Sequence, residues 1–322
     1  MRDMDSMTFE QIRKMTDEDA RSALESIRWP SGVECPRCGS RDVLSVAGGR
    51  AGLYRCHACR KNPGQKSDQF SVTVGTIFED SHIPLGKWVM AFHLVCSSKK
   101  GVSALQLQRQ LELGSYRSAW HMAHRIRHAM KSGPGTPPLS GIVEVDETYV
   151  GGKPRHKGKA SMGKVGRATD MAPVVAMIER DGRIKAVSPQ KLGGGNLAQA
   201  VAENIHKDST LMTDEYNVYN QVGKTFKGGH HTVTHSKGQY ARRHKEMNVH
   251  VNTCESWFAL LKRGVHGTFH HVERQHLGRY CDEFEFRWDH RKTTDAERTT
   301  AALQKTPGKR LMYRGLVGKM SV

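Results

Sequence analysis

The chain has 322 residues and is strongly basic, since 50 Lys and Arg stand against 32 Asp and Glu and give a formal net charge of +18. This excess favours a polyanionic partner, with nucleic acid as the leading candidate. The charged N-terminal residues contain no apolar signal region, and the longest apolar stretch, residues 88–96, is far shorter than the ~20 residues that span a membrane. The seven cysteines, an odd number, argue against a disulfide scaffold and favour a reducing compartment, so we expect a cytoplasmic protein without a membrane partner.

Residues 1–29 are predicted to form a helical arm. Thr8 with Gln11 and Thr16 with Asp19 have the spacing of helix N-caps, and Pro30 ends the helical pattern. Packing against the rest of the protein is the simplest interpretation of this arm.

Two Cys-x2-Cys pairs follow within residues 30–65. Cys35 and Cys38 are separated from Cys56 and Cys59 by 17 residues, a spacing typical of paired zinc knuckles. Four thiolates bind Zn²⁺ tetrahedrally and leave no open position for water, which predicts a structural zinc. His57 could replace one cysteine, but four cysteines are the preferred ligand set. The remaining cysteines are interpreted as buried core thiols: Cys96, Cys254 and Cys281.

Residues 66–136 have the periodicity of helices. Ser103 has the N-cap spacing to Gln106, a turn follows at residues 113–115, and a second helix carries apolar residues at steps of three and four. The opposite face of that second helix carries four basic side chains, namely Arg117, His121, Arg125 and His128. This layout is typical of a helix-turn-helix whose second helix enters the major groove of DNA. A plain helical hairpin with a solvated basic face is the alternative.

After a Gly- and Pro-rich linker at residues 133–138, the pattern changes to that of strands. Strands are expected at residues 141–150, 172–178, 183–187, 210–213 and 230–234, and helices at residues 196–206 and 251–263. Residues 153–169 carry six Lys and Arg and no acid, which predicts a basic loop. Its expected DNA contacts are Lys153, Arg155, Lys157 and Lys159. The last 24 residues also lack an acid and are expected to form a solvated basic tail.

Carboxylates lie at three points where the predicted elements could bring them together. Asp146 lies within a strand, Asp214 follows the end of another strand, and Glu255 lies on the last of these helices. Glu144 shares the face of Asp146 by strand alternation and Glu147 lies on the opposite face, so both are alternatives. Three close carboxylates repel one another unless divalent cations neutralise them, and hard oxygen ligands suit Mg²⁺ or Mn²⁺. The competing interpretation is that each acid is a cap or a surface charge.

These motifs in this order resemble the bacterial insertion-sequence transposases that join an N-terminal zinc ribbon to a DDE-type, ISXO-like catalytic domain. The resemblance runs from residue 29 to residue 291. It rests on the segments CPRCGS…YRCHACRK, FSVTVGTIFEDSHIPLGKWVMAFHLV, VEVDETYVGGK, TDEYNVY and HVNTCESWFALLKRGVHGTFHHV, followed by RYCDEFEFRWDHR.

The resemblance implies a role for each acid. Asp146, Asp214 and Glu255 match the three catalytic acids, which would bind Mg²⁺ or Mn²⁺. Lys262 matches a basic residue that contacts DNA phosphate. Asn252 is a second candidate for the third position, because Asn can replace the acid in this family. The implied reaction is two-metal phosphoryl transfer, in which the element's ends are nicked and the freed 3′-hydroxyl attacks target DNA directly.

The resemblance also implies a multidomain organisation. The expected parts are an N-terminal helical arm (1–29), a zinc ribbon (30–65), a helical helix-turn-helix region (66–136), an α/β RNase H-like domain with a mixed sheet flanked by helices (137–295) and the basic tail (296–322). The expected partners are double-stranded DNA, both terminal inverted repeats and target, and further copies of the chain, since two paired ends require at least a dimer. The implied location is the nucleoid of a bacterial cytoplasm.

Three alternatives compete with this interpretation. A covalent mechanism would need a nucleophile such as Tyr149, Tyr216 or Tyr219, but the motifs that accompany tyrosine nucleophiles are missing, so packing or DNA contact is preferred. A DNA-binding regulator without catalysis would bind DNA and never nick it. A metal-dependent nuclease of the same fold would cleave without joining.

Overall fold

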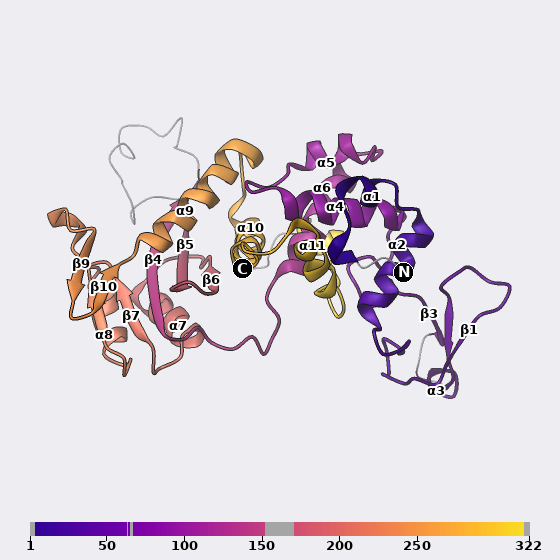
Figure 1. The fold of residues 1–322 in the computed structure, drawn as a ribbon, viewed down its shortest axis with the longest axis horizontal. Helices are drawn as coiled ribbons and strands as arrows, with labels where there is room; N and C mark the ends of the chain where they lie inside the picture. The colour runs from indigo at the N-terminus through magenta and orange to yellow at the C-terminus, as the bar shows by residue number, and fades with distance from the viewer. Residues whose placement is uncertain (1–3, 63, 65–66, 152–170, 319–322) are drawn as a thin grey trace. The chain divides into compact units, whose positions relative to one another are not determined.

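A computed structural model describes residues 4–62, 64, 67–151 and 171–318, and the chain divides into two compact units (Figure 1). The first unit comprises Met1–Met130 and Lys292–Val322, and the second comprises Lys131–Arg291. The predicted basic loop with Lys153, Arg155, Lys157 and Lys159 lies outside the described residues. Among the described residues, no helix is both long and apolar enough to cross a membrane.

The first unit begins with short helices whose N-caps are the predicted ones. The elements are η1 (Met4–Ser6), α1 (Phe9–Arg13) and α2 (Asp17–Arg28). Thr8 accepts a hydrogen bond from the Gln11 amide and Thr16 accepts one from the Asp19 amide, and both residues form full capping boxes. The spacing of Thr8 and Thr16 therefore predicted both helix starts correctly.

A small ribbon of three antiparallel strands follows, with β1 (Val43–Ser45), β2 (Tyr54–Cys56), β3 (Gln69–Phe70) and the short α3 (His57–Arg60). Phe70 is buried among cysteines of the ribbon, and Trp29 and Tyr54 pack beside it. Arg28 at the end of α2 donates to the carbonyls of Val72 and Val74 at 2.5 and 2.7 Å. These two hydrogen bonds join the helical arm to the chain that leaves the ribbon.

Helices from both ends of the sequence build the rest of the first unit (Figure 1). They are α4 (Leu85–Ser97), α5 (Ala104–Gln110), α6 (Tyr116–Met130), α11 (Asp295–Gln304) and α12 (Tyr313–Val317). His93 of α4 lies 3.2 Å from the Thr299 hydroxyl of α11, and Arg298 donates to the Cys96 carbonyl at 3.0 Å.

The prediction of a solvated basic tail over the last 24 residues is therefore wrong for the part that forms α11. Ala302 and Leu303 are 0% and 1% exposed, because α11 turns its apolar face toward α4. The prediction followed the basic residues of this stretch and overlooked its few apolar positions, which form the buried face of α11.

The second unit contains a five-stranded mixed sheet in the order β6-β5-β4-β7-β8. The strands are β4 (Ile142–Val150), β5 (Ala172–Glu179), β6 (Ile184–Val187), β7 (Thr210–Thr213) and β8 (His230–Thr232). β4, β5 and β6 form an antiparallel meander, whereas β7 is parallel to β4 and β8 is parallel to β7. A separate hairpin, β9 (Ala241–His244) with β10 (Met247–His250), was not predicted.

Helices cover both faces of this sheet. α7 (Gly194–Asn204) and α8 (Val218–Gly223) pack on one face, where Val143 and Val145 of β4 join a core with Leu197 and Tyr219. α9 (Asn252–Gly264) and α10 (Arg274–Asp289) pack on the other face, and the π-helical turn η5 (Val265–Phe269) follows α9. β4 is the central strand and is covered on both faces, so Glu144 is completely buried and Asp146 and Glu147 are partly buried.

Acidic side chains of α10 close the free edge of β6. Glu285 accepts a hydrogen bond from the Ala186 amide at 2.6 Å, and Asp289 accepts one from the Ile184 amide at 3.0 Å. Lys185 lies 3.5 Å from the second oxygen of Glu285. Edge strands expose unpaired N–H groups, and here a helix satisfies two of them.

Glu285 should make the stability of the second unit depend on pH. Burial raises the pKa of Glu285 to about 7 from an ordinary value of 4.5. The folded state then holds one extra proton between these values, so stability is fully present below pH 4.5 and falls as the pH rises toward 7. The loss amounts to about 3 kcal/mol for a shift of this size.

Glu285→Gln removes this titration and keeps an oxygen that can accept from Ala186. Unfolding in urea at pH 5 and pH 8 should show a larger loss of stability for the wild type than for the variant. Parallel pH profiles would contradict the buried, titrating role of Glu285.

Candidate zinc and acid sites

Four cysteines of the ribbon converge, as the sequence predicted. The sulfur atoms lie within 4.8 Å of one another, with Cys35 to Cys59 and Cys38 to Cys56 both at 3.6 Å and Cys38 to Cys59 at 3.5 Å. Cys38 is exposed, the other three are buried, and all four thiols are free of disulfides. His57 does not belong to this cluster, so the preference for four cysteines is supported.

Local backbone geometry holds each pair of thiols. In the first knuckle the Cys35 amide donates to the Ser40 carbonyl and the Gly39 amide donates to the Cys35 carbonyl, both at 2.9 Å. Gly39 has a φ of 72°, the left-handed region that glycine adopts without strain. In the second knuckle the sulfur of Cys56 caps α3 by accepting from the Cys59 amide at 3.4 Å. A closed set of four thiolates fits structural Zn²⁺.

Removing one of these ligands should release zinc and unfold the ribbon. Cys35→Ser is expected to lose bound zinc and to lower the melting temperature, because structural zinc contributes folding free energy directly. Cys96→Ser is the matched control, since Cys96 is equally buried but lies outside the cluster. Zinc content by metal analysis and thermal melting check this. Full zinc content with unchanged melting in Cys35→Ser would refute the site.

The register of two strands places the first two predicted acids side by side. Ile142, Val143 and Glu144 of β4 are paired with Thr210, Leu211 and Met212 of the parallel strand β7. Continued by two residues, the same register sets Asp146 opposite Asp214, which directly follows β7. Neighbouring strands lie ~4.8 Å apart, so the backbones of Asp146 and Asp214 lie close together at the end of β7.

The third acid approaches from the helix that covers this face. Glu255 lies in the first turn of α9, which packs against β4 and β5 (Figure 1). Burial first, and then the negative charges of Glu147, Asp214 and Glu255, raise the pKa of the Asp146 carboxyl well above its ordinary value. Asp146 therefore lies in the electrostatic field of both other acids. Among the described residues, only the four cysteines have ligand atoms mutually within 4.8 Å, so the acid oxygens are more widely spaced.

The two alternative carboxylates of β4 are already engaged by protein donors. Glu147 points to the opposite face, as alternation predicts, and accepts a hydrogen bond from the Tyr219 hydroxyl at 2.7 Å. Glu144 is fully buried and accepts hydrogen bonds from Arg180 and Thr253. Both contacts support structural roles for these acids.

The tyrosines near the acids differ in their contacts. Tyr219 is completely buried in the core, which supports the packing interpretation for it. The backbone amide of Tyr216 donates to the Asp214 carboxylate at 3.0 Å, and the two tyrosine rings meet edge to face at 6.0 Å. Tyr149 lies near the end of β4 and is partly buried. The Tyr219 hydroxyl donates to the Glu147 carboxylate at 2.7 Å, but the burial of Tyr219 does not favour a role as a nucleophile that attacks DNA.

Lys262 and Asn252 lie on the same helix as Glu255. Lys262 is partly buried two turns after Glu255, and Asn252 is the exposed first residue of α9. Their proposed contacts with DNA or metal stay predictions.

The predicted basic face of α6 is largely turned inward. α5 and α6 form with the predicted turn between them, but Arg125 is 6% exposed, donates to the Glu79 carbonyl and lies over the Trp88 ring at 5.6 Å. The prediction that Arg125 lies on an outer face is therefore wrong. Helix periodicity identified the face opposite the apolar stripe, but the segment around Glu79 covers part of it.

The chain around α12 covers two more members of this face. A ring nitrogen of His121 lies 3.2 Å from the Leu311 carbonyl, and the guanidinium of Arg117 stacks over the Tyr313 ring at 5.6 Å. Arg117 remains exposed and keeps its predicted DNA contact as a prediction. His128 is partly buried.

A basic segment beside Glu255 was missed at the level of sequence. His235 lies 3.8 Å from the Glu255 carboxylate and packs against the Tyr240 ring at a centroid distance of 5.4 Å. Tyr240 is 61% exposed, and Arg243 and Lys245 of the β9–β10 hairpin are exposed as well. Residues 235–246 contain four Lys and Arg and one acid, a signal that could have identified the segment.

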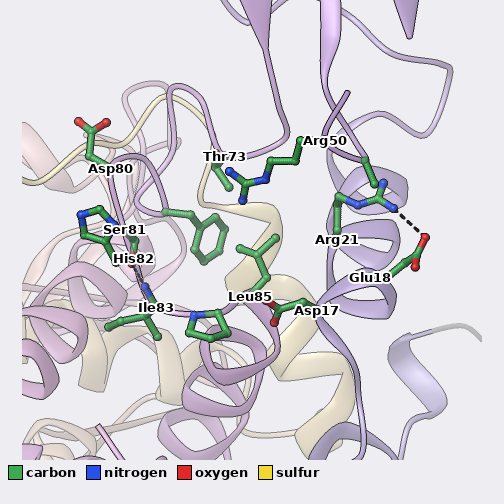
Figure 2. Close-up of a pocket in the computed structure, with 13 residues that line it drawn as sticks. Asp17, Glu18, Arg21, Arg50, Thr73, Asp80, Ser81, His82, Ile83 and Leu85 are labelled. Atoms are coloured by element: carbon green, nitrogen blue, oxygen red, sulfur yellow. Dashed lines mark hydrogen bonds and ion pairs between the residues drawn. The ribbon is translucent and has the colours of Figure 1, made fainter. Parts of the chain in front are cut away.

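The first unit contains a surface cavity of about 680 Å³ between α2, the β1–β2 loop and the start of α4. Figure 2 shows Arg50 reaching toward Thr73 in this cavity, while Arg21 pairs with Glu18. Its remaining charged lining groups include Asp17 and Asp80. Because acids and bases are mixed, the lining does not favour a polyanion, and the cavity is not assigned a ligand.

Comparisons with known proteins match two segments of the chain, and each candidate site lies within one of them. Residues 15–62 match a transposase zinc-ribbon domain, and residues 138–289 match an ISXO2-like transposase domain. An uncharacterized protein in transposable element ISH50 of Halobacterium salinarum is 27% identical over 284 residues, which cover 85% of this chain and 91% of that protein. No solved structure matches. The chain is therefore similar to insertion-sequence transposases in two segments, a zinc ribbon and, after it, an ISXO2-like transposase domain.

Proposed function

We propose that this protein is a transposase that nicks the ends of an insertion sequence and joins the freed 3′-hydroxyl to target DNA by two-metal phosphoryl transfer. The observation that carries the proposal is the placement of Asp146 on β4 and Asp214 directly after the adjacent parallel strand β7, with Glu255 in the first turn of α9, which packs against β4. All three acids lie within the segment that matches the transposase domain. The mixed sheet with β4 at its centre supports an RNase H-like fold for this unit.

The acids have the donor chemistry of a divalent-metal site. Burial first, and then the neighbouring carboxylates, raise the pKa of Asp146, and a bound cation would relieve the repulsion among the carboxylates. Asp146, Asp214 and Glu255 would hold Mg²⁺ or Mn²⁺, with Asn252 as the alternative third ligand. Two such ions would activate the attacking oxygen and stabilise the leaving oxygen.

Basic groups near the acids would hold the DNA. Lys262 follows Glu255 along α9, and the exposed side chains Arg243 and Lys245 lie on the neighbouring hairpin. The zinc ribbon and, through the exposed Arg117, the α5–α6 pair would recognise the terminal inverted repeats, and two paired ends imply at least a dimer on DNA. The proposed reaction would take place at the bacterial nucleoid, where the DNA lies.

A strand-transfer assay tests the proposal. The protein is incubated with a duplex that ends in the element's flanking repeat, a supercoiled target and Mg²⁺ or EDTA. Joined product should require Mg²⁺ and be absent from Asp146→Asn and Asp214→Ala. DNA binding by Asp146→Asn should stay within a few fold of the wild type, because the substitution removes a metal ligand and no phosphate contact.

The other outcomes distinguish the competing functions. Metal-dependent cleavage without joining, even from a pre-nicked 3′-hydroxyl end, would identify a nuclease. Binding with neither cleavage nor joining would identify a regulator. A large loss of DNA binding in Asp146→Asn would contradict the role of this residue as a metal ligand.

Lys262 should contribute one phosphate contact. Lys262→Ala is expected to weaken end binding and to lower the slope of log K against log salt by about 0.9, the effect of one phosphate contact. Lys224→Ala is the control, because Lys224 is an exposed lysine at the end of α8. Binding isotherms at several salt concentrations measure both slopes. A slope in Lys262→Ala equal to that of the wild type would mean that Lys262 contacts no phosphate.

A further inference from the structure

Glu144 is a completely buried carboxylate two residues before Asp146 on β4. A buried charge costs several kcal/mol unless donors compensate it. Its position on the central strand therefore requires a network of donors, and the structure supplies one from two distant segments.

Arg180 and Thr253 provide the donors. Arg180 reaches one oxygen of Glu144 through Nε at 3.2 Å and Nη2 at 3.1 Å, and its Nη1 donates to the Asn248 carbonyl at 2.6 Å. Thr253 donates its backbone amide and its hydroxyl to the two Glu144 oxygens, both at 2.9 Å. A ring nitrogen of His250 lies 3.3 Å from the same carboxylate.

These contacts replace a local cap at the start of α9. The N-cap residue Val251 has no side chain that can accept a hydrogen bond. Helix N-termini carry unpaired amides and a partial positive charge, which a carboxylate satisfies. Glu144 accepts the Thr253 amide and so serves as the cap, although it lies 109 positions away in the sequence.

The next residue, Cys254, packs the first turn of α9 against the sheet. Cys254 is fully buried, and its sulfur lies 3.5 Å from the Glu144 carbonyl and 3.7 Å from the Ala176 carbonyl. Thr253 and Cys254 thus fix the first turn of α9 on β4 at Glu144. Glu255 follows in the same turn, and Asp146 follows two residues along the strand.

We propose that Glu144, held by Arg180, is a positioning residue that sets Glu255 relative to Asp146 through the Thr253 hydroxyl and amide. The inference rests on the proposed function, because it concerns the site that the two acids would form. Glu144 itself touches neither DNA nor metal in this role. Disturbing the network should lower metal affinity and leave DNA binding intact.

Thr253→Val and Thr253→Ser test the network in the full-length protein. Valine has the shape of threonine and lacks the hydroxyl, whereas serine keeps it. Thr253→Val should bind Mn²⁺ about tenfold more weakly and need correspondingly more Mg²⁺ for cleavage, as loss of a hydrogen bond behind a metal ligand typically does. Thr253→Ser should stay within about twofold of the wild type, and both variants should bind end DNA like the wild type.

Mn²⁺ binding, measured by electron paramagnetic resonance without DNA, separates the possible outcomes. Equal Mn²⁺ affinity in Thr253→Val and wild type would overturn the inference while leaving the proposed function in place. Equal loss in the valine and serine variants would also overturn it, because the hydroxyl would not matter. A wild type that neither binds Mn²⁺ nor cleaves would overturn the proposed function together with the inference.

Glu144→Gln is a second test of the network. It turns an amide toward the Thr253 N–H or Arg180, and it should weaken Mn²⁺ binding as Thr253→Val does.

Discussion

The second unit depends on how it compensates the carboxylates of its central strand, β4. Glu144 and Asp146 lie on the same face of β4, where an uncompensated charge would cost several kcal/mol. Arg180 neutralises the charge of Glu144, and Arg180 and Thr253 both donate hydrogen bonds to its carboxylate. Asp146 instead receives the Glu147 amide and lies near further carboxylates. One strand therefore supplies both the anchor of α9 and the electronegative centre of the proposed site.

Several of the arginines of the chain form hydrogen bonds within the protein. Arg28, Arg125 and Arg298 each donate to backbone carbonyls within the first unit, and Arg180 does so in the second. A guanidinium has five donors in a fixed plane, which suits it to bridge carbonyls that no strand or helix pairs. The net charge of +18 thus overstates the surface that is free to meet DNA. The exposed basic groups are more informative than the total.

Local features of this fold could be predicted from the sequence and long-range ones could not. The cap at Thr16 depends on residues three positions apart, and the knuckle at Cys35 depends on a tight turn, so both are written in short motifs. The burial of Arg125 depends on the segment around Glu79, and the α9 cap depends on Glu144. The three candidate acids were predicted from motifs and resemblance, but the nearness of Asp146 and Asp214 required the register of β4 and β7.

The first unit is discontinuous, and this has a consequence for how the protein is made. α4 packs against α11, so one side of its apolar surface stays uncovered until residues 295–304 leave the ribosome. The whole of the second unit is synthesised in between. Domains generally fold as units during synthesis, so the second unit can finish folding while the first still waits for its last helices. A gene truncated after the second unit and before α11 would yield a chain whose second unit is complete. Its first unit would expose the apolar surface of α4 that α11 normally covers, and chaperones and proteases recognise such exposed apolar surface.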